Sequence, residues 1–235
     1  VVPIWNSSKR VTGIIDVLNK RAYEMQNLKR VEIDVPADKV SVIEEFNDAL
    51  KEAVAETDEA LMDRFFEGGD FTYREMITGL HQGVKDLSLF PVLCGSGVTC
   101  LGSLMLMDHI IELLPNPVEG NYHKATTADG KVEEFVVSPG GVPSAFVWKT
   151  VSDQFGKFSY VKVLSGEINA DTTLVNSRTG ETEKLGRLYT MCGKKNTEVK
   201  ALTCGDIGAI GKMDKVKTGD TLCDPRKVVS LKQIP

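Results

Sequence analysis

The sequence lacks the signatures that would mark a membrane protein, a metal centre or an enzyme with its own phosphate-binding loop. Its apolar runs all stay well below the roughly 20 residues that span a bilayer. Neither a C-x-x-C pair nor two histidines at helical ligand spacing is present. The loop G-x-x-x-x-G-K-[ST], whose backbone amides cradle nucleotide phosphates, is missing as well. We therefore expect no membrane partner, no metal ligands and no nucleotide hydrolysis by this chain alone.

Catalytic side chains are equally scarce. No Ser/His/Asp or Cys/His set stands out as a nucleophile with its base, and Glu44 and Glu45 fall on different faces of a predicted helix. We assign no catalytic residue. The five cysteines are odd in number, which fits unpaired thiols in a reducing, cytoplasmic compartment. Residues 1–5 predict a strand of a larger protein rather than a signal peptide.

The charges divide the chain into an acidic part and a basic part. Residues 1–143 carry 13 Lys and Arg against 23 Asp and Glu, a balance of −10. Residues 144–235 carry 15 against 10, a balance of +5. Such a division predicts two surfaces with different partners, although ordinary solubility charge would also explain it.

The first half alternates between strand and helix patterns. Strands are predicted at 12–18 and 30–35, where β-branched and apolar residues recur or alternate. An amphipathic helical region follows over 38–66, with a break near Thr57 and Asp58, and a shorter helix is predicted over 72–84. A buried strand over 87–94, a small-residue turn and a helix over 103–114 complete the series. This strand, turn and helix are typical of half an α/β nucleotide-binding unit.

The second half predicts a different architecture. Residues 118–143, rich in proline and glycine, predict a linker. From Ser144 onward, short apolar runs alternate with glycine turns, which predicts a small β-barrel.

Two charged surfaces are candidates for binding. An acidic stripe at helical spacing comprises Glu45, Asp48, Glu52, Glu56 and Glu59. Its like charges oppose the helix slightly, which favours a basic partner, although solubility alone is an alternative explanation. A basic group surrounds a predicted turn in the barrel, and basic loops of small β-barrels commonly bind RNA. Its members are Arg187, Lys194, Lys195 and Lys200, with Lys212, Lys215 and Lys217 in a later loop.

Several blocks of the sequence resemble one family in the same order along the chain. They are Glu52–Met62, Pro91–Ser96, Leu113–Pro117, Ala145–Thr150, Phe155–Tyr160, Leu164–Gly166 and Thr218–Asp224. The first block resembles the G′ insertion of bacterial translation elongation factor G, the second its fifth nucleotide-binding motif, and the third the end of its GTPase domain. The other four resemble its second domain, a translation-factor β-barrel. The resemblance covers essentially the whole chain.

The resemblance implies the fold class and the domain organisation. Residues 1–117 would be an α/β portion, comprising the G′ insertion and the C-terminal part of an incomplete GTPase domain. Residues 118–143 would be the linker, and residues 144–235 an all-β barrel of the translation-factor domain II type. The parent would be a GTPase that moves transfer RNA and messenger RNA on the ribosome, with GTP or GDP and Mg²⁺ as its ligands. Its phosphate loop, switch regions and N-K-x-D motif would lie upstream, so this fragment should bind no cofactor and lack turnover.

The resemblance also implies roles for particular residues. Cys94, Gly95, Ser96 and Gly97 match the loop that the family uses against the guanine base. Glu52, Glu56 and Glu59 match acidic positions that face the ribosomal stalk protein. Arg187, Lys194 and Lys195 lie in the domain that touches small-subunit ribosomal RNA. The ribosome is therefore the expected partner, and DNA is not.

Some positions depart from the commonest form of the family. Gly97 replaces the usual alanine of the guanine loop, which leaves the backbone amide in place but frees the loop. Residues 87–90 and 153–156 resemble divergent second copies of the factor found in many bacteria. One alternative is therefore a paralog that acts in ribosome binding, recycling or protection without translocation. Another is a non-enzymatic ribosome- or RNA-binding module.

Overall fold

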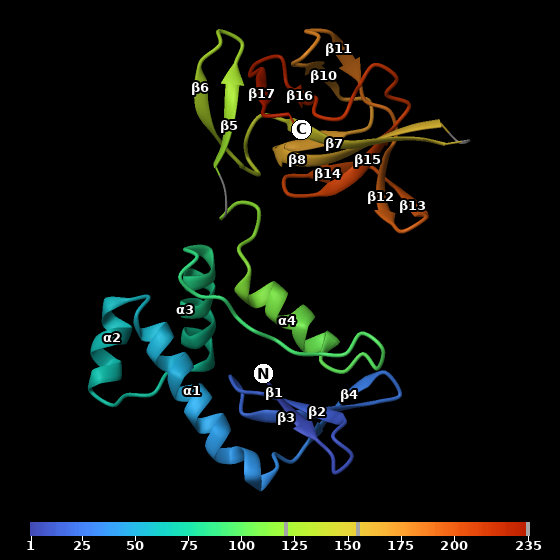
Figure 1. Ribbon diagram of the computed structural model, residues 1–235. Coiled ribbons are helices and arrows are strands. Elements are labelled where there is room, and N and C mark those ends of the chain that lie inside the picture. Colours follow the sequence, from blue (N-terminus) through green and yellow to red (C-terminus); the bar gives the residue numbers. More distant parts are fainter. Residues whose placement is uncertain (120–121, 154–155, 234–235) are drawn as a thin grey trace. The chain divides into compact units, whose positions relative to one another are not determined.

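The computed structural model describes residues 1–119, 122–153 and 156–233 (Figure 1). The chain forms two compact units, Val1–Pro115 and Asn116–Pro235. The first contains helices and a small sheet, and the second is built from strands.

The sheet of the first unit is antiparallel, with its four strands in chain order (Figure 1). The strands are β1 (Val2–Trp5), β2 (Val11–Asp16), β3 (Arg21–Gln26) and β4 (Lys29–Ile33). Consecutive residues of a strand point to opposite faces. Ile15 accordingly packs against Ile43 of α1 (Val40–Ala55), and Ile14 packs against Met105 of α4 (Ser103–Leu113). The sheet is thus covered by a helix on each face, and the strands predicted at 12–18 and 30–35 are confirmed.

Helix boundaries follow local capping. After the 3₁₀ turn η1 (Ala37–Lys39), α1 ends at Ala55, and Asp58 starts α2 (Glu59–Phe66) by accepting hydrogen bonds from the amides of Ala60 and Leu61. The predicted break near Thr57 and Asp58 is therefore confirmed. A capping box between Thr72 and Glu75 starts α3 (Tyr73–Lys85). Hydrogen bonds from the Thr72 amide and hydroxyl, and then from Arg64, lower the pKa of Glu75 to about 2.

The prediction of a buried strand over 87–94 is wrong. Residues 87–94 form no strand with any described residue, and Phe90 and Val92 are 75% and 83% exposed. A strand requires a neighbour to accept its backbone hydrogen bonds. Beside residues 89–93 the structure instead has a cavity of about 130 Å³, lined also by Val1, Leu80 and Leu113. The apolar run therefore marks a surface that no strand of the described residues covers.

Most strands of the second unit surround the larger of its two apolar clusters. An eight-stranded antiparallel sheet has the order β11-β10-β16-β7-β8-β15-β12-β13, with β11 and β13 at its ends among the described residues. The core contains Val147, Val161, Leu188, Ile210 and Leu222, each fully buried. Bounds are β7 Ser144–Asp153, β8 Gly156–Ser165, β10 Thr173–Asn176, β11 Thr182–Lys184, β12 Leu188–Cys192, β13 Lys195–Val199, β15 Ile207–Gly211 and β16 Thr221–Cys223. The short pair β9 (Glu167–Asn169) and β14 (Ala201–Thr203) adds Ile168 and Leu202 to this core.

The segment expected to be a linker is largely part of the second unit. It forms β5 (Tyr122–Thr127) and β6 (Val132–Val136), which join β17 (Val229–Leu231) in a three-stranded sheet. Ala125 and Phe135 are buried there with Val229. Proline, glycine and charged residues of this segment lie in its turns and on its exposed face, which is why its composition predicted a linker.

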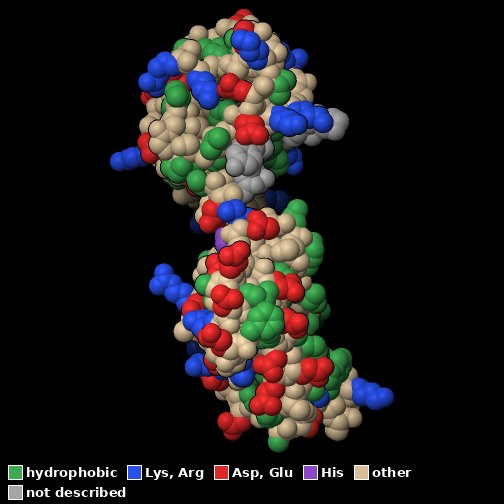
Figure 2. All heavy atoms as spheres, turned by 90° about the vertical axis from the view of Figure 1, so that its left-hand side faces the viewer, with side chains coloured by type: hydrophobic (Ala, Val, Ile, Leu, Met, Phe, Trp, Pro, Cys, Tyr) green, Lys and Arg blue, Asp and Glu red, His purple; other side chains and the backbone are tan. Residues whose placement is uncertain are grey.

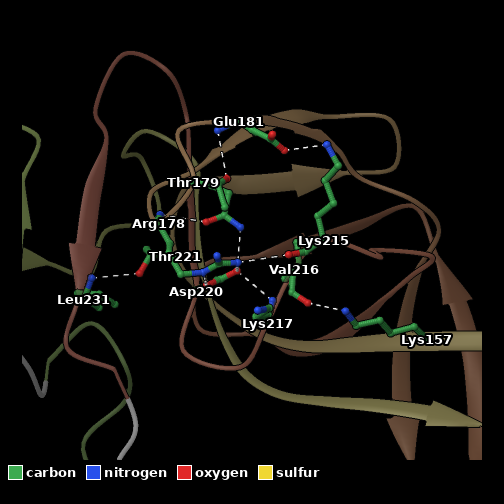
Figure 3. Close-up of polar contacts among 11 residues, drawn as sticks. Lys157, Arg178, Thr179, Glu181, Lys215, Val216, Lys217, Asp220, Thr221 and Leu231 are labelled. Atoms are coloured by element: carbon green, nitrogen blue, oxygen red, sulfur yellow. Dashed lines mark hydrogen bonds and ion pairs between the residues drawn. The ribbon is translucent and has the colours of Figure 1, made fainter.

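A buried carboxylate holds the loop between β15 and β16 against the barrel-like sheet (Figure 3). The Asp220 side chain is 1% exposed. It accepts hydrogen bonds from Arg178 Nε at 2.6 Å, from Asn176 Nδ2 at 2.8 Å and from the Lys217 amide at 2.9 Å. Lys157 Nζ ties the same loop to β8 by donating to the carbonyl oxygens of Asp214 and Val216.

These contacts set the charge of Asp220. Burial by itself raises the pKa of this carboxyl, but hydrogen bonds from Arg178, Lys217 and Asn176 outweigh burial and hold it below its ordinary value of 3.8. A group whose pKa is lower in the folded state contributes stability above its unfolded pKa. We expect that contribution to disappear as the pH falls below 3.8.

We predict that Asp220→Asn destabilises the second unit by about 3 kcal/mol, because it leaves the buried donors facing an amide. Urea denaturation at neutral pH measures the loss, and the acid-dependent part of the stability should also become smaller. Glu181→Gln is the matched control, since its ion pair with Lys215 has both side chains more than half exposed and should contribute under about 1 kcal/mol. Equal effects of the two substitutions would contradict the role given to Asp220.

We also predict that Gly79→Ala destabilises the first unit. A Cβ at this buried position of α3 would lie 2.6 Å from Val54 Cγ1 on α1. The resulting overpacking costs roughly 1–3 kcal/mol, against a helix-propensity gain of about 1 kcal/mol. Thermal unfolding followed by circular dichroism tests this, with the neighbouring exposed Thr78→Ala as control. A gain in stability for Gly79→Ala would show that the two helices separate easily.

Candidate functional site

The loop before α4 is built on close backbone contact. The Ser96 amide donates to the Leu101 carbonyl oxygen at 2.8 Å, and the Thr99 amide donates to Ser96 Oγ at 3.2 Å. A Cβ at Gly95 would lie 2.9 Å from the Leu101 oxygen, and one at Gly102 would lie 2.7 Å from the Cys94 oxygen. Gly102 also has a φ of +80°, which favours glycine. The two glycines therefore allow the turn to fold back and start the helix.

This geometry leaves the outer side of the turn free to meet a ligand. Cys94, Gly95 and Gly97 are exposed, and a Cβ at Gly97 would have no atom within 4 Å. The Ser96 amide is used inside the turn, so a flat ligand would meet the Gly97 side of the loop. The predicted turn and the helix after it are confirmed, while the role of the loop in binding a base stays a prediction.

The acidic stripe lies on α1 and α2. Glu45, Asp48 and Glu52 are exposed on α1, Glu56 is its C-cap, and Glu59 is the first residue of α2. Figure 2 shows acidic side chains gathered on a face of the first unit.

Two of the three glutamates predicted to face the ribosomal stalk protein line the same hollow. A hollow of about 270 Å³ at the end of α1 is lined by Glu56 and Glu59, together with Asp58, Asp63 and Met62. Glu52 lies one helical turn before Glu56 on the same side of α1. The hollow combines several carboxylates with apolar atoms, so it suits a basic side chain with an aliphatic stem.

The three basic residues predicted to contact RNA, Arg187, Lys194 and Lys195, lie at opposite ends of one hairpin. Lys194 is in the two-residue turn between β12 and β13, and Lys195 pairs with Cys192 at its tip. Arg187 precedes β12, about 17 Å away along the strand. It forms an ion pair with Glu198 at 3.4 Å, both side chains being more than half exposed. The structure therefore brings Lys194 and Lys195 together, but not with Arg187.

The later basic loop is partly neutralised. Lys215 pairs with Glu181 at 2.8 Å, whereas Lys212 and Lys217 are exposed. Phe155, the first residue of the family-like block 155–160, lies outside the described residues. Gln154, which belongs to the segment 153–156 that departs from the commonest form of the family, lies outside them as well.

Sequence reasoning missed a group of aromatic side chains in the second unit. Trp148 packs on Tyr160 with ring centroids 5.5 Å apart, and Phe158 packs on Tyr189 at 5.7 Å. The sequence contains a signal for this group, because Phe158 and Tyr160 alternate with the small or β-branched Ser159 and Val161 and so lie on one face of a strand.

Within residues 1–119, 122–153 and 156–233, no helix is long and apolar enough to cross a membrane. The same residues include no group of three or more His, Cys, Asp or Glu side chains that could hold a metal ion.

Comparison with known proteins gives consistent matches over the whole chain. Residues 143–225 match the family described as Elongation factor G domain 2. The chain is 34% identical to Elongation factor G 2 of Pseudoalteromonas translucida over 98% of its length and 34% of that protein. It is 32% identical to Elongation factor G of Cytophaga hutchinsonii, with 97% and 34% covered. A crystal structure of a Thermus thermophilus protein superimposes with a TM-score of 0.81 and 26% identity, covering 100% of this chain and 33% of that one.

The chain spans about one third of the length of the curated relatives that it matches. Its mixed helix-and-sheet unit is followed by a β-rich unit of the domain II type, as the sequence predicted. These matches and this architecture show that the chain belongs to the elongation factor G family.

Proposed function

We propose that this chain is the part of an elongation factor G-like translational GTPase that comprises the G′ insertion, the end of the GTPase domain and domain II. The observation that carries the proposal is the match of residues 143–225 to Elongation factor G domain 2, together with relatives named Elongation factor G along the rest of the chain. The parent would hydrolyse GTP to drive translocation in protein synthesis, in the cytoplasm.

The turn at residues 94–97 would form one wall of the guanine site in the parent. This role is supported by the backbone turn, which the Ser96 amide closes by a hydrogen bond to the Leu101 carbonyl oxygen, and by the open space beside Gly97. GTP or GDP would be bound mainly by residues outside this sequence, which would also hold Mg²⁺. The fragment has no G-x-x-x-x-G-K-[ST] loop of its own, so it would contribute base contact without phosphate binding.

An exposed apolar surface supports the view that further protein packs on the first unit. Phe90 and Val92, which line the same cavity, are 75% and 83% exposed. Large exposed apolar side chains grouped near one another commonly mark an interface. The rest of a GTPase domain would cover them.

Two ribosome contacts are proposed. Glu52, Glu56 and Glu59 would meet the ribosomal stalk protein, which is supported by their exposure and by the acidic hollow between α1 and α2. Arg187, Lys194 and Lys195 would meet small-subunit ribosomal RNA, which is supported by two exposed lysines at a hairpin tip. Contacts to phosphates would make this binding weaken with salt.

A second candidate is a paralog that binds ribosomes for recycling or protection without translocating. Relatives at 34% identity carry the name Elongation factor G 2, which favours a divergent copy. Sequencing the coding region upstream of Val1 tests the shared part of both proposals. A phosphate loop, D-x-x-G and N-K-x-D in order would support a GTPase, and a translocation assay on the complete gene product would then separate the two candidates. A start codon without these motifs would favour a non-enzymatic ribosome- or RNA-binding module.

We predict that the 235-residue chain alone shows no measurable GTP binding by calorimetry, because base contact without phosphate contacts supplies too little of the affinity. The complete gene product should bind GTP under the same conditions. A micromolar dissociation constant for the isolated chain would contradict the division of the guanine site.

We predict that reversing Glu52, Glu56 and Glu59 to Lys in the complete gene product slows ribosome-stimulated GTP hydrolysis by about tenfold or more, since like charges would then face a basic partner. The basal hydrolysis rate should change little. Reversal of three other exposed acids of the same unit is a control with equal charge change; they are Glu32 on β4, Asp34 just after it and Asp38 in η1. An unchanged stimulated rate, or an equal loss in the control, would remove the stalk assignment.

A further inference from the structure

We propose that the outer face of the second unit's sheet is a stacking platform for unpaired bases of single-stranded RNA. We call this surface the aromatic face and define it by Trp148, Phe158, Tyr160 and Tyr189. It differs from the hairpin tip that carries Lys194 and Lys195. It also does not require the chain to come from a GTPase, so it can fail or hold independently of the proposed function.

Strand alternation places the four rings on one side of the sheet. On β8, Ser159 and Val161 are fully buried towards the core, whereas Phe158 and Tyr160 point the opposite way and are half-buried. Tyr189 on β12 and Tyr160 on β8 lie opposite the same residue of β15, Ala209. They therefore stand on the same face of three neighbouring strands.

The fourth ring, that of Trp148, lies on this face because Trp148 follows the buried core residue Val147 on β7. The register between β7 and β8 shifts between Val147, which pairs with Val161, and Lys149, which pairs with Tyr160. Trp148 is the extra residue, and this bulge places Lys149 on the outer face as well, opposite Tyr160. Its ring packs on Tyr160 and remains 37% exposed.

Small residues of β15 form the floor between the rings. Ala209 lies between Tyr160 and Tyr189 in the register, and Gly211 lies opposite Phe158. A Cβ at Gly211 would lie 3.5 Å from Tyr189 Cε2 and 3.9 Å from Phe158 Cε1. Because the strand between the rings carries almost no side-chain bulk, the aromatic groups dominate the surface.

Positive charge borders the aromatic face. Lys149 is exposed beside Tyr160, and Lys162 follows Tyr160 on the same side of β8. Lys212 is exposed immediately after β15. The nearby acid Glu198 is already paired with Arg187. Residues 144–235 as a whole carry five more basic than acidic side chains, so the surroundings suit an anionic ligand.

Rings bordered by lysines favour one class of partner. Proteins that bind single strands combine aromatic side chains, on which bases stack, with cations that meet the phosphates. Duplex bases are already stacked on each other and cannot lie on the rings. An apolar protein partner would use the rings but would gain nothing from the surrounding lysines.

Fluorescence of Trp148 gives a direct test on the 235-residue chain. The sequence has two tryptophans, and Trp5→Phe leaves Trp148 as the only reporter. We expect a short oligouridylate to quench it at low salt, and a duplex RNA of equal length to do so much less. Trp148→Ala should weaken binding, measured by fluorescence anisotropy of a labelled oligonucleotide, by about tenfold. Phe66→Ala, at a 78% exposed aromatic residue of the first unit, is the control and should bind normally.

A second variant distinguishes a loss of RNA binding from a loss of folding. Lys149 is exposed, so Lys149→Glu should keep the circular dichroism spectrum while weakening binding and reducing its dependence on salt. Absence of quenching would overturn the proposal, as would equal affinity for duplex RNA. Binding that survives Trp148→Ala and Lys149→Glu but is lost on reversal of Lys194 and Lys195 would place the RNA on the hairpin tip instead. Concentration-dependent dimerisation that shields Trp148 would show that a second copy covers the face.

Discussion

The second unit depends on the burial of one carboxylate. Asp220 has almost no contact with water, and such a charge is tolerated only when donors surround it. Its donors come from Asn176 at the end of β10, from Arg178 just after that strand, and from the loop before β16. One side chain therefore fixes the strand pair β10–β16 and the loop that carries Lys215 and Lys217. Surface ion pairs such as that of Lys215 are exposed and cannot impose the same order.

The sheet anchored in this way uses its two faces differently. Inward residues such as Val161 and Ile210 are completely buried and form the core, while Tyr160 and Ala209, their neighbours in sequence, form the outer face. Near Leu164 the outer face is covered by β5, β6 and β17. Towards Phe158 it stays partly open. The same strand thus supplies stability at one end and an available surface at the other.

The first unit joins two kinds of surface through one small sheet. Helix α1 packs on one face through Ile43 and α4 packs on the other through Met105. Helix α1 carries most of the acidic stripe, and α4 starts directly after the Gly95–Gly102 turn. A rigid connection through the sheet would fix the spacing between the proposed stalk contact and the proposed guanine loop. That arrangement suits a protein in which partner binding and nucleotide binding are coupled.

The sequence by itself determined the elements whose causes are local. Asp58 and the Thr72–Glu75 capping box mark helix starts, and alternation marks the strands, because these signals act within a few residues. The family could also be recognised from the sequence blocks that resemble it in the same order along the chain. Tertiary structure decided what depends on distant partners. Ala125 belongs to a strand because it pairs with Leu231, and Phe90 and Val92 stay exposed because no described strand lies beside residues 87–94. The aromatic face likewise exists only because β7, β8, β12 and β15 are neighbours, which local sequence does not specify.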